Sequence, residues 1–298
     1  MPSRSSREVQ PPGVPSPAHA SKALDRNGLV VGAQSPRSCR AEELLWSFDE
    51  YRRRVAAEPR SHFFRVGSAD QWLFYAGFRH SADPANPDFA ALEDFWREFL
   101  AACPPSRRLV LVEGEVRLVE SDRGRAIGEG GEGGLVAFLA NRDGIPDLLS
   151  AEPEPAKLVA EHLKRFPRGL VAYAYYARLV PVWHRFAART SFPEFAAKSP
   201  ALQVADLNWS RPTVERLHRE MFGRAFDERD RDFFARITDP ASSSTVINLI
   251  LREDSRHRDL HMLRTLATAW QAGKHIFVVS GASHAIMQRR AVEMLVRG

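Results

Sequence analysis

The pattern that most constrains the fold of this chain is an apolar run that ends in Gly-x-x-His, and it occurs twice. The run at 72–76 leads into Gly77-Phe78-Arg79-His80, and the run at 276–279 leads into Gly281-Ala282-Ser283-His284. A short apolar run that breaks at glycine is typical of a buried β-strand. Each copy therefore predicts a strand followed by a turn that presents a histidine. Because the two copies lie near opposite ends of the chain, only the fold can bring the histidines together.

The segments near the first copy predict an α/β unit. Two aromatic-rich runs at 62–66 and 72–77 flank a polar turn, which is typical of a β-hairpin. Apolar residues at helical spacing follow at 88–100, and the run at 109–112 ends before Glu113-Gly114. A short apolar run between a helix and a glycine favours a buried parallel strand. Strands separated by helices indicate an α/β fold with a central mixed, largely parallel sheet flanked by helices.

The rest of the chain predicts mainly helices, with an additional helical segment in the middle. A short strand is expected at 145–149, and residues 246–251 fit either a strand or a helix. Ser210 and Pro212 are expected to begin a helix. The final strand at 276–281 is followed by a terminal helix. Further helices are expected at 41–57, 158–166, 169–189, 227–237, 257–271 and 286–295.

Polar residues follow several of the apolar runs. His80, Glu113, Glu152 and His284 each come just after a run. In α/β sheets, ligands bind outside the carboxyl ends of the strands. The sequence therefore predicts one site that contains these four side chains.

The glycine-rich stretch at 128–134 also carries a candidate site residue, Glu132. The stretch matches G-x-G-x-x-G, but no clear strand leads into it, and two glutamates would repel a pyrophosphate. We therefore interpret it as a flexible loop that brings Glu132 to the site, and not as a dinucleotide-binding turn.

These residue types suit metal-assisted hydrolysis, although each also has a purely structural interpretation. His80, His284 and Glu113 are ligands suited to Mn, Co, Zn or Fe, and a bound metal lowers the pKa of water towards about 7. Glu113 is alternatively a general base, and Arg258, expected near the start of a helix, would stabilise an oxyanion. Structurally, the histidines would bond to backbone and the glutamates would cap turns and helices. Arg258 would then pair with one of its neighbours, Glu253, Asp254 or Asp259.

Six short motifs are spread over residues 62–290: Gly77-Phe78-Arg79-His80, Val112-Glu113-Gly114, Gly131-Glu132-Gly133, Ala151-Glu152-Pro153, Arg258-Asp259-Leu260-His261-Met262 and Gly281-Ala282-Ser283-His284. Together they resemble the TraB/PrgY and Tiki superfamily, which is distantly related to the erythromycin esterases and the ChaN haem-uptake proteins. The resemblance implies an α/β fold and, from the Tiki members, a divalent-metal-dependent peptidase that uses the two histidines and a glutamate.

Composition limits the setting of the protein. At 44% hydrophobic and 27% charged residues, the chain is typical of a soluble globular protein. Scattered Arg residues give a net charge of +5 without a cluster for nucleic acid, and no apolar run approaches the roughly 18 residues that span a membrane. With only two cysteines and no signal peptide, we expect a cytoplasmic protein. Residues 1–40, rich in Pro, Ser, Arg and Gly, are expected to be a disordered tail before a single domain at 41–298.

The sequence thus leads to one principal functional hypothesis and two alternatives. The first is a metal-dependent hydrolase, possibly a peptidase, acting on a small molecule or a peptide. The second is a metal-independent, esterase-like hydrolase in which a histidine activates water and a glutamate orients it. The third is a non-enzymatic protein that uses the site to bind haem or a signalling peptide. The oligomeric state is left open.

Overall fold

The structure is a computed structural model that describes residues 41–55, 60–116, 121–186 and 190–297. The predicted disordered tail at 1–40 lies outside the described residues. All of the described residues belong to one compact unit. The start of a domain at residue 41 stays a prediction. Within the described ranges, no helix is long and apolar enough to cross a membrane.

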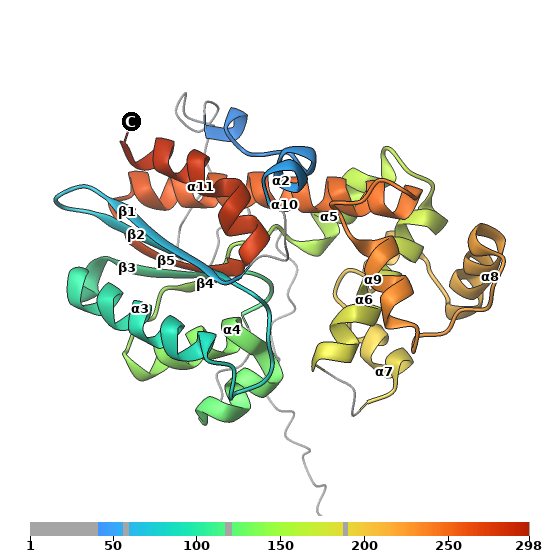
Figure 1. Ribbon diagram of the computed structural model, residues 1–298, viewed down its shortest axis with the longest axis horizontal. Coiled ribbons are helices and arrows are strands. Elements are labelled where there is room, and N and C mark those ends of the chain that lie inside the picture. Colours follow the sequence, from blue (N-terminus) through green and yellow to red (C-terminus); the bar gives the residue numbers. More distant parts are fainter. Residues whose placement is uncertain (1–40, 56–59, 117–120, 187–189, 298) are drawn as a thin grey trace, which may run out of the picture. The chain divides into compact units, whose positions relative to one another are not determined.

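A five-stranded sheet organises the N-terminal and C-terminal parts of the chain (Figure 1). The strand order is β1-β2-β5-β3-β4, in which β1 and β2 pair antiparallel and the other neighbours pair parallel. This confirms the predicted α/β class, the β-hairpin and the largely parallel sheet. The strand bounds are β1 His62–Gly67, β2 Trp72–Phe78, β3 Arg108–Val112, β4 Leu148–Ser150 and β5 His275–Gly281.

The register aligns the ends of the four parallel strands at one edge. Phe78 pairs with Gly281, and Val112 pairs with both Val279 and Ser150. Because β5 lies between β2 and β3, the last strand of the chain separates the strands of the predicted β–α–β unit. The segments that follow β2 and β5 therefore begin side by side, as the shared-site hypothesis requires.

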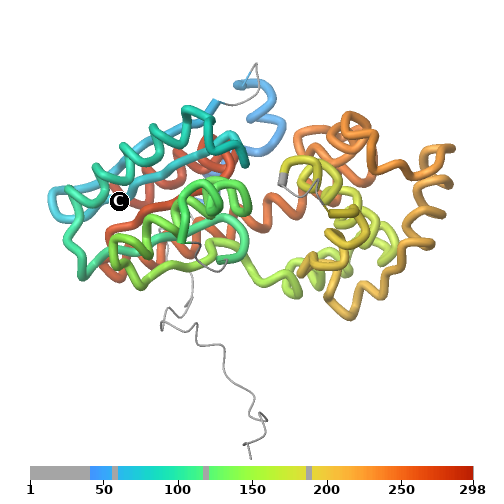
Figure 2. Tube along the Cα trace, turned by 90° about the horizontal axis from the view of Figure 1, so that it is seen from below, coloured from blue at the N-terminus to red at the C-terminus, as the bar shows by residue number. Residues whose placement is uncertain are grey.

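Helices cover both faces of the sheet. The helices α3 (Asp88–Ala102) and α4 (Arg123–Arg142) pack on the face that carries Phe74, Phe78 and Phe277, and Figure 2 shows the two helices running alongside each other. On the other face lie α11 (Ala282–Arg297) and the C-terminal part of α10 (Val246–Gln271). Alternate side chains of β2 and β5 point to opposite sides of the sheet, and the helices on the two sides bury them.

The middle of the chain forms a second hydrophobic core made of helices, as predicted. This core gathers aromatic and aliphatic side chains from α5 to α9 and from the start of α10. Ser210 caps α8 and Pro212 lies in its first turn, so that prediction is confirmed. The bounds are α5 Pro155–Leu163, α6 Arg168–Phe186, α7 Phe192–Ala197, α8 Arg211–Phe222 and α9 Arg231–Thr238, with 3-10 turns η1 Pro105–Arg107 and η2 Ala205–Leu207.

Three predictions differ from the structure: the start of the helix that carries Arg258, the extent of the helix at 41–57, and the glycine-rich stretch. The segment 246–251, which fitted either a strand or a helix, is helical, since Thr245 and Asn248 form a capping box that starts α10 there. Arg258 therefore lies in the middle of a 26-residue helix and not near its start. A capping box at Ser47 similarly begins α2 at Phe48 (Phe48–Arg54), so the expected helix at 41–57 is shorter.

The glycine-rich stretch is the third difference, because it belongs to helix α4 and not to a flexible loop. The helix is kinked at Gly131, whose φ of 59° is readily adopted only by glycine. A Cβ atom on Gly134 would lie 2.1 Å from the carbonyl oxygen of Ala126. These glycines thus allow a kink and a close backbone approach, and the kink immediately precedes Glu132.

Candidate functional site

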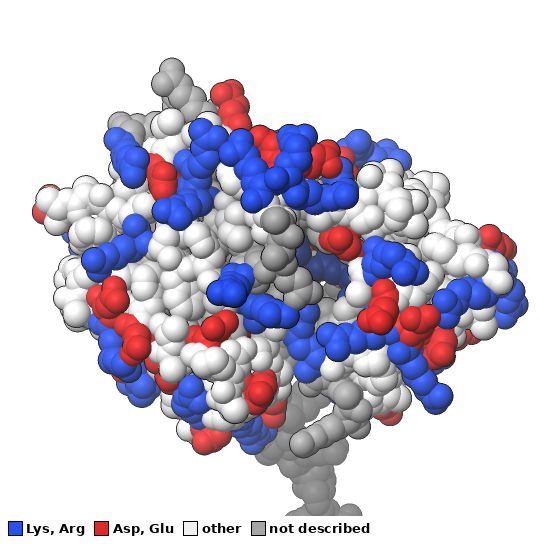
Figure 3. All heavy atoms as spheres, viewed as in Figure 1, with Lys and Arg blue, Asp and Glu red and all other residues white. Residues whose placement is uncertain are grey.

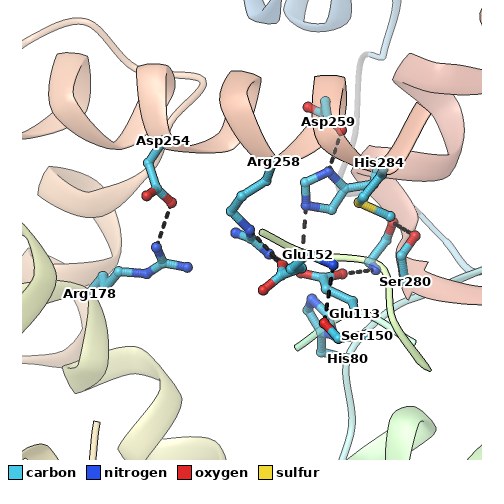
Figure 4. A network of polar contacts seen from close by, with 12 residues as sticks. His80, Glu113, Ser150, Glu152, Arg178, Asp254, Arg258, Asp259, Ser280 and His284 are labelled. Atoms are coloured by element: carbon cyan, nitrogen blue, oxygen red, sulfur yellow. Dashed lines mark hydrogen bonds and ion pairs between the residues drawn. The ribbon is translucent and has the colours of Figure 1, made fainter. Parts of the chain in front are cut away.

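All the sequence-predicted site residues meet at the carboxyl edge of the sheet. His80 follows β2, Glu113 follows β3, and Glu152 follows β4. His284 lies in the first turn of α11, directly after β5, so it belongs to a helix and not to a turn before one. Together with Glu132 and Arg258 they line one cavity of about 760 Å³. Figure 4 shows how most of these side chains converge.

The two glycines of the repeated motif have different packing roles. A Cβ atom on Gly281 would lie 2.8 Å from Nε2 of His80, so glycine lets this imidazole approach the end of β5. A Cβ atom on Gly77 would lie 2.3 Å from the Cβ atom of Ala285, so glycine lets α11 pack closely on β2. The first glycine shapes the site, whereas the second joins the elements that carry it.

His284 is held between two carboxylates. Its Nδ1 lies 2.6 Å from Oδ1 of Asp259, and its Nε2 lies 3.6 Å from Oε1 of Glu113. Burial lowers the pKa of His284, but Asp259 and Glu113 outweigh burial and raise this pKa to about 9. His284 is therefore an imidazolium at neutral pH, oriented by Asp259.

His80 has a similar arrangement with a different partner. Its Nδ1 contacts Oε1 of Glu132, which is buried in α4. The His80 side chain is 35% exposed, so it lies nearer to solvent than His284, whose side chain is 8% exposed. Burial lowers the pKa of His80, but Glu132 outweighs burial and the net shift is upward. The other oxygen of Glu132, Oε2, is buried without a hydrogen-bond partner among the described residues.

Arg258 joins the two remaining glutamates. Its Nη2 donates to Oε1 of Glu113 at 2.6 Å, and its Nε donates to Oε1 of Glu152 at 2.5 Å. Arg258 therefore pairs with glutamates that are distant in the chain. The structural alternative expected from the sequence was a pair with Glu253, Asp254 or Asp259, and it is wrong.

Glu113 is the most highly connected carboxylate of the cluster. Besides Arg258, it accepts a hydrogen bond at Oε2 from the backbone N–H of Gly281 at 2.5 Å. Burial raises the pKa of Glu113, but His284 and Arg258 outweigh burial and hold this pKa well below its usual range. Glu113 is consequently a permanent anion between two cations, which suits an electrostatic role better than that of a general base.

Sequence reasoning missed the polar residues behind His284. Oδ1 of Asp259 also accepts a hydrogen bond from Nε2 of Gln288 at 2.6 Å. The hydroxyl of Tyr75 donates to Oε1 of Gln288 at 3.0 Å and accepts a hydrogen bond from Ser280 at 3.2 Å. All four residues are buried. A signal existed for Gln288, because its helix neighbours Ala291 and Val292 are apolar and buried, and a buried polar residue needs partners.

No family model matches the chain, and the comparisons with curated proteins and with solved structures find no significant match. Membership of the TraB/PrgY and Tiki superfamily therefore stays a prediction.

The two motif glycines give a paired prediction. We expect Gly281→Ala to lower activity at the site with little loss of stability, because its methyl group displaces the partly exposed His80 ring. We expect Gly77→Ala to reduce the free energy of unfolding by about 1–3 kcal/mol, because overpacking shifts α11 against β2. Thermal unfolding and hydrolysis assays of both variants check this contrast. Equal effects of the two substitutions on stability would contradict it.

Proposed function

We propose that this protein is a hydrolase in which an imidazole activates water and a cluster of positive charges stabilises the oxyanion. The single observation that supports this proposal most strongly is the paired arrangement of the histidines. Each has its Nδ1 against a carboxylate, which leaves Nε2 as the reactive nitrogen, and both line the same cavity as Arg258. A histidine oriented by a carboxylate is the usual form of a general base.

The surroundings of the two histidines favour different roles. His80 is the more exposed and has one carboxylate partner, so it is the proposed base that takes a proton from water, oriented by Glu132. His284 is buried between Asp259 and Glu113 and stays protonated at neutral pH. With Arg258 it would provide positive charge for the tetrahedral intermediate formed from an ester or an amide. Glu113 and Glu152 would hold Arg258 in place.

The metal-dependent alternative has support from one feature and opposition from another. Metal-binding histidines commonly carry a carboxylate on their second nitrogen, as His80 and His284 do. Glu113, however, already accepts a hydrogen bond from the guanidinium of Arg258 at 2.6 Å, and the positive charge of this guanidinium would repel a metal cation. Among the described residues no group of three or more His, Cys, Asp or Glu side chains is placed to hold a metal ion. The residues as arranged do not fit a metal, and the proposed reaction uses none.

Hydrolysis assays with a chelator test the proposed function. Purified protein would be assayed against p-nitrophenyl acetate and against peptide p-nitroanilides, before and after treatment with EDTA, with its metal content measured in parallel. We expect hydrolysis that survives EDTA in protein without stoichiometric metal. Activity that disappears with EDTA and returns with Mn²⁺, Co²⁺ or Zn²⁺ would favour the metal-dependent alternative. Inactivity towards every ester and amide would count against a hydrolase, and a Soret band on haem titration would favour a binding protein.

The roles assigned to the histidines also predict a pH profile. His80 must lose its proton to act as a base, so kcat/KM should rise with pH, and because the pKa of His80 is raised, the rise should extend to higher pH than it would for an ordinary histidine. His284 must keep its proton, so kcat/KM should fall as the pH passes through about 9. The measurement is kcat/KM between pH 5 and pH 10 on a neutral ester, corrected for its spontaneous hydrolysis. A rate that rises without limit across this range would contradict the role of His284.

A further inference from the structure

One wall of the cavity is a face of helix α6 that presents two arginines. Arg178, Val182 and Arg185 lie four and three residues apart, so they share one face of the helix, and all three line the cavity. This helix belongs to the helical segment, whereas the histidines belong to the end of the sheet. The end of the sheet therefore lines the cavity with the two histidines, and α6 lines it with positive charge.

Arg178 is held in a fixed orientation by a buried carboxylate. Its Nη1 donates to Oδ2 of Asp254 at 2.7 Å, and the Asp254 side chain is 1% exposed. Oδ1 of Asp254 accepts a hydrogen bond from the hydroxyl of Tyr175 at 2.7 Å and faces Nε2 of His162 at 3.3 Å. Burial raises the pKa of Asp254, but Arg178 and His162 outweigh burial and keep this residue ionised. Such a network fixes a guanidinium more firmly than an exposed pair would.

The remaining N–H groups of Arg178 are available to a ligand. Within the described residues Arg178 hydrogen-bonds through Nη1, and its side chain is 32% exposed at the cavity. Several carboxylates that line the cavity are bound to other cations: Glu113 and Glu152 bind Arg258, Glu132 contacts His80, and Glu129 pairs with Arg125. Figure 4 shows the guanidinium groups of Arg178 and Arg258 on the same side of α10. Lys and Arg side chains also border a hollow on the face drawn in Figure 3.

We propose that the cavity takes a substrate that carries an anionic group, a carboxylate or a phosphate, and that Arg178 binds this group. The inference rests on the proposed hydrolase function and adds the class of substrate. A planar guanidinium matches the two oxygens of a carboxylate or phosphate in a bidentate geometry. With the anion on α6, the bond to be hydrolysed would extend across the cavity towards His80 and His284.

The alternative explanation is that Arg178 and Asp254 only tie α6 to α10. The chain offers a matched control for that possibility, because Arg165 also reaches α10, where its Nη1 lies 2.7 Å from Oε2 of Glu253. Arg165 is more exposed, and it lies outside the set of described residues that line the cavity. A purely structural role predicts that Arg178 affects stability but not the choice between charged and neutral substrates.

The experiment compares a charged and a neutral ester and measures anion binding separately. Wild-type protein, Arg178→Met, Arg178→Lys and Arg165→Met would be assayed with mono-p-nitrophenyl glutarate and with p-nitrophenyl acetate. We expect Arg178→Met to lower the ratio of kcat/KM for the charged ester over the neutral one by at least about tenfold, which is the loss of one charged hydrogen bond. Arg178→Lys should lose less, and Arg165→Met should keep the wild-type ratio. Circular dichroism checks that each variant is folded.

Calorimetric titration with glutarate and with inorganic phosphate measures anion binding independently of hydrolysis. It also shows whether the site prefers a carboxylate or a phosphate. Binding of either anion that weakens at least about tenfold in Arg178→Met supports the site, even if no ester is hydrolysed and the proposed function fails. The anion that binds more tightly identifies the substrate group. If both esters are hydrolysed but Arg178→Met and Arg178→Lys leave the ratio and anion binding unchanged, the inference is overturned while the hydrolase proposal stands. Absence of anion binding together with an unchanged ratio also overturns it.

Discussion

Replacing Arg258 with methionine is expected to lower the free energy of unfolding by about 3–5 kcal/mol. The guanidinium contacts both Glu113 and Glu152, and all three side chains are at least four-fifths buried. Methionine fills a similar volume but leaves two carboxylates without their cation, and breaking a buried pair in this way is strongly destabilising. For a domain of this size the loss corresponds to a fall in Tm of roughly 10 °C. Chemical and thermal unfolding of the variant measure it.

Two further variants show whether unpaired charge is the cause. Arg216→Met removes an exposed pair with Glu220 on α8 and should change stability by less than about 1 kcal/mol. Adding Glu113→Gln and Glu152→Gln to Arg258→Met should restore part of the lost stability, because neutral amides are less costly to bury than carboxylates. If the triple variant is less stable than Arg258→Met alone, the loss has another origin, such as packing in the middle of α10.

The sequence allowed the sheet and the position of the site to be predicted, because both depend on short-range patterns. Apolar runs that stop at glycine identified β2 and β5, and polar residues after the runs identified His80, Glu113 and His284. Parallel strands align their carboxyl ends, so this placement needed no knowledge of long-range contacts. The strand order, with β5 between β2 and β3, needed the structure.

The partners within the site were not predictable in the same way. Asp259 orients His284, and Glu113 and Glu152 bind Arg258, across separations that no local pattern reveals. The long helix α10 shows the reason, since the apolar run 246–251 fits a strand equally well until the Thr245 cap is considered. Once that run is helical, Asp254 and Arg258 lie one turn apart on a face towards the cavity. A correct helix start would therefore have added Asp254 to the site beside Arg258, which the sequence had already indicated.

Replacing His80 with glutamine is expected to lower kcat/KM by about 10²–10⁴, the usual contribution of a general base. The amide of glutamine can still donate a hydrogen bond to Glu132, so the buried carboxylate keeps a partner and the fold is expected to persist. The amide cannot take a proton from water, so the rising limb of the pH profile should disappear. His184→Ala is the matched control, because His184 hydrogen-bonds the carbonyl of Glu228 and lies outside the described residues that line the cavity.

Rescue by free imidazole distinguishes a base from a residue that only positions others. The His80 side chain is 35% exposed at the cavity, so a small molecule can reach the space left by His80→Ala. If His80 is the base, added imidazole should restore part of the activity of this variant, with a pH dependence that follows the pKa of imidazole in solution. His284→Ala should respond less, because that side chain is 8% exposed and its loss leaves Asp259 buried without a cation. Equal rescue of both variants would contradict the division of roles between the two histidines.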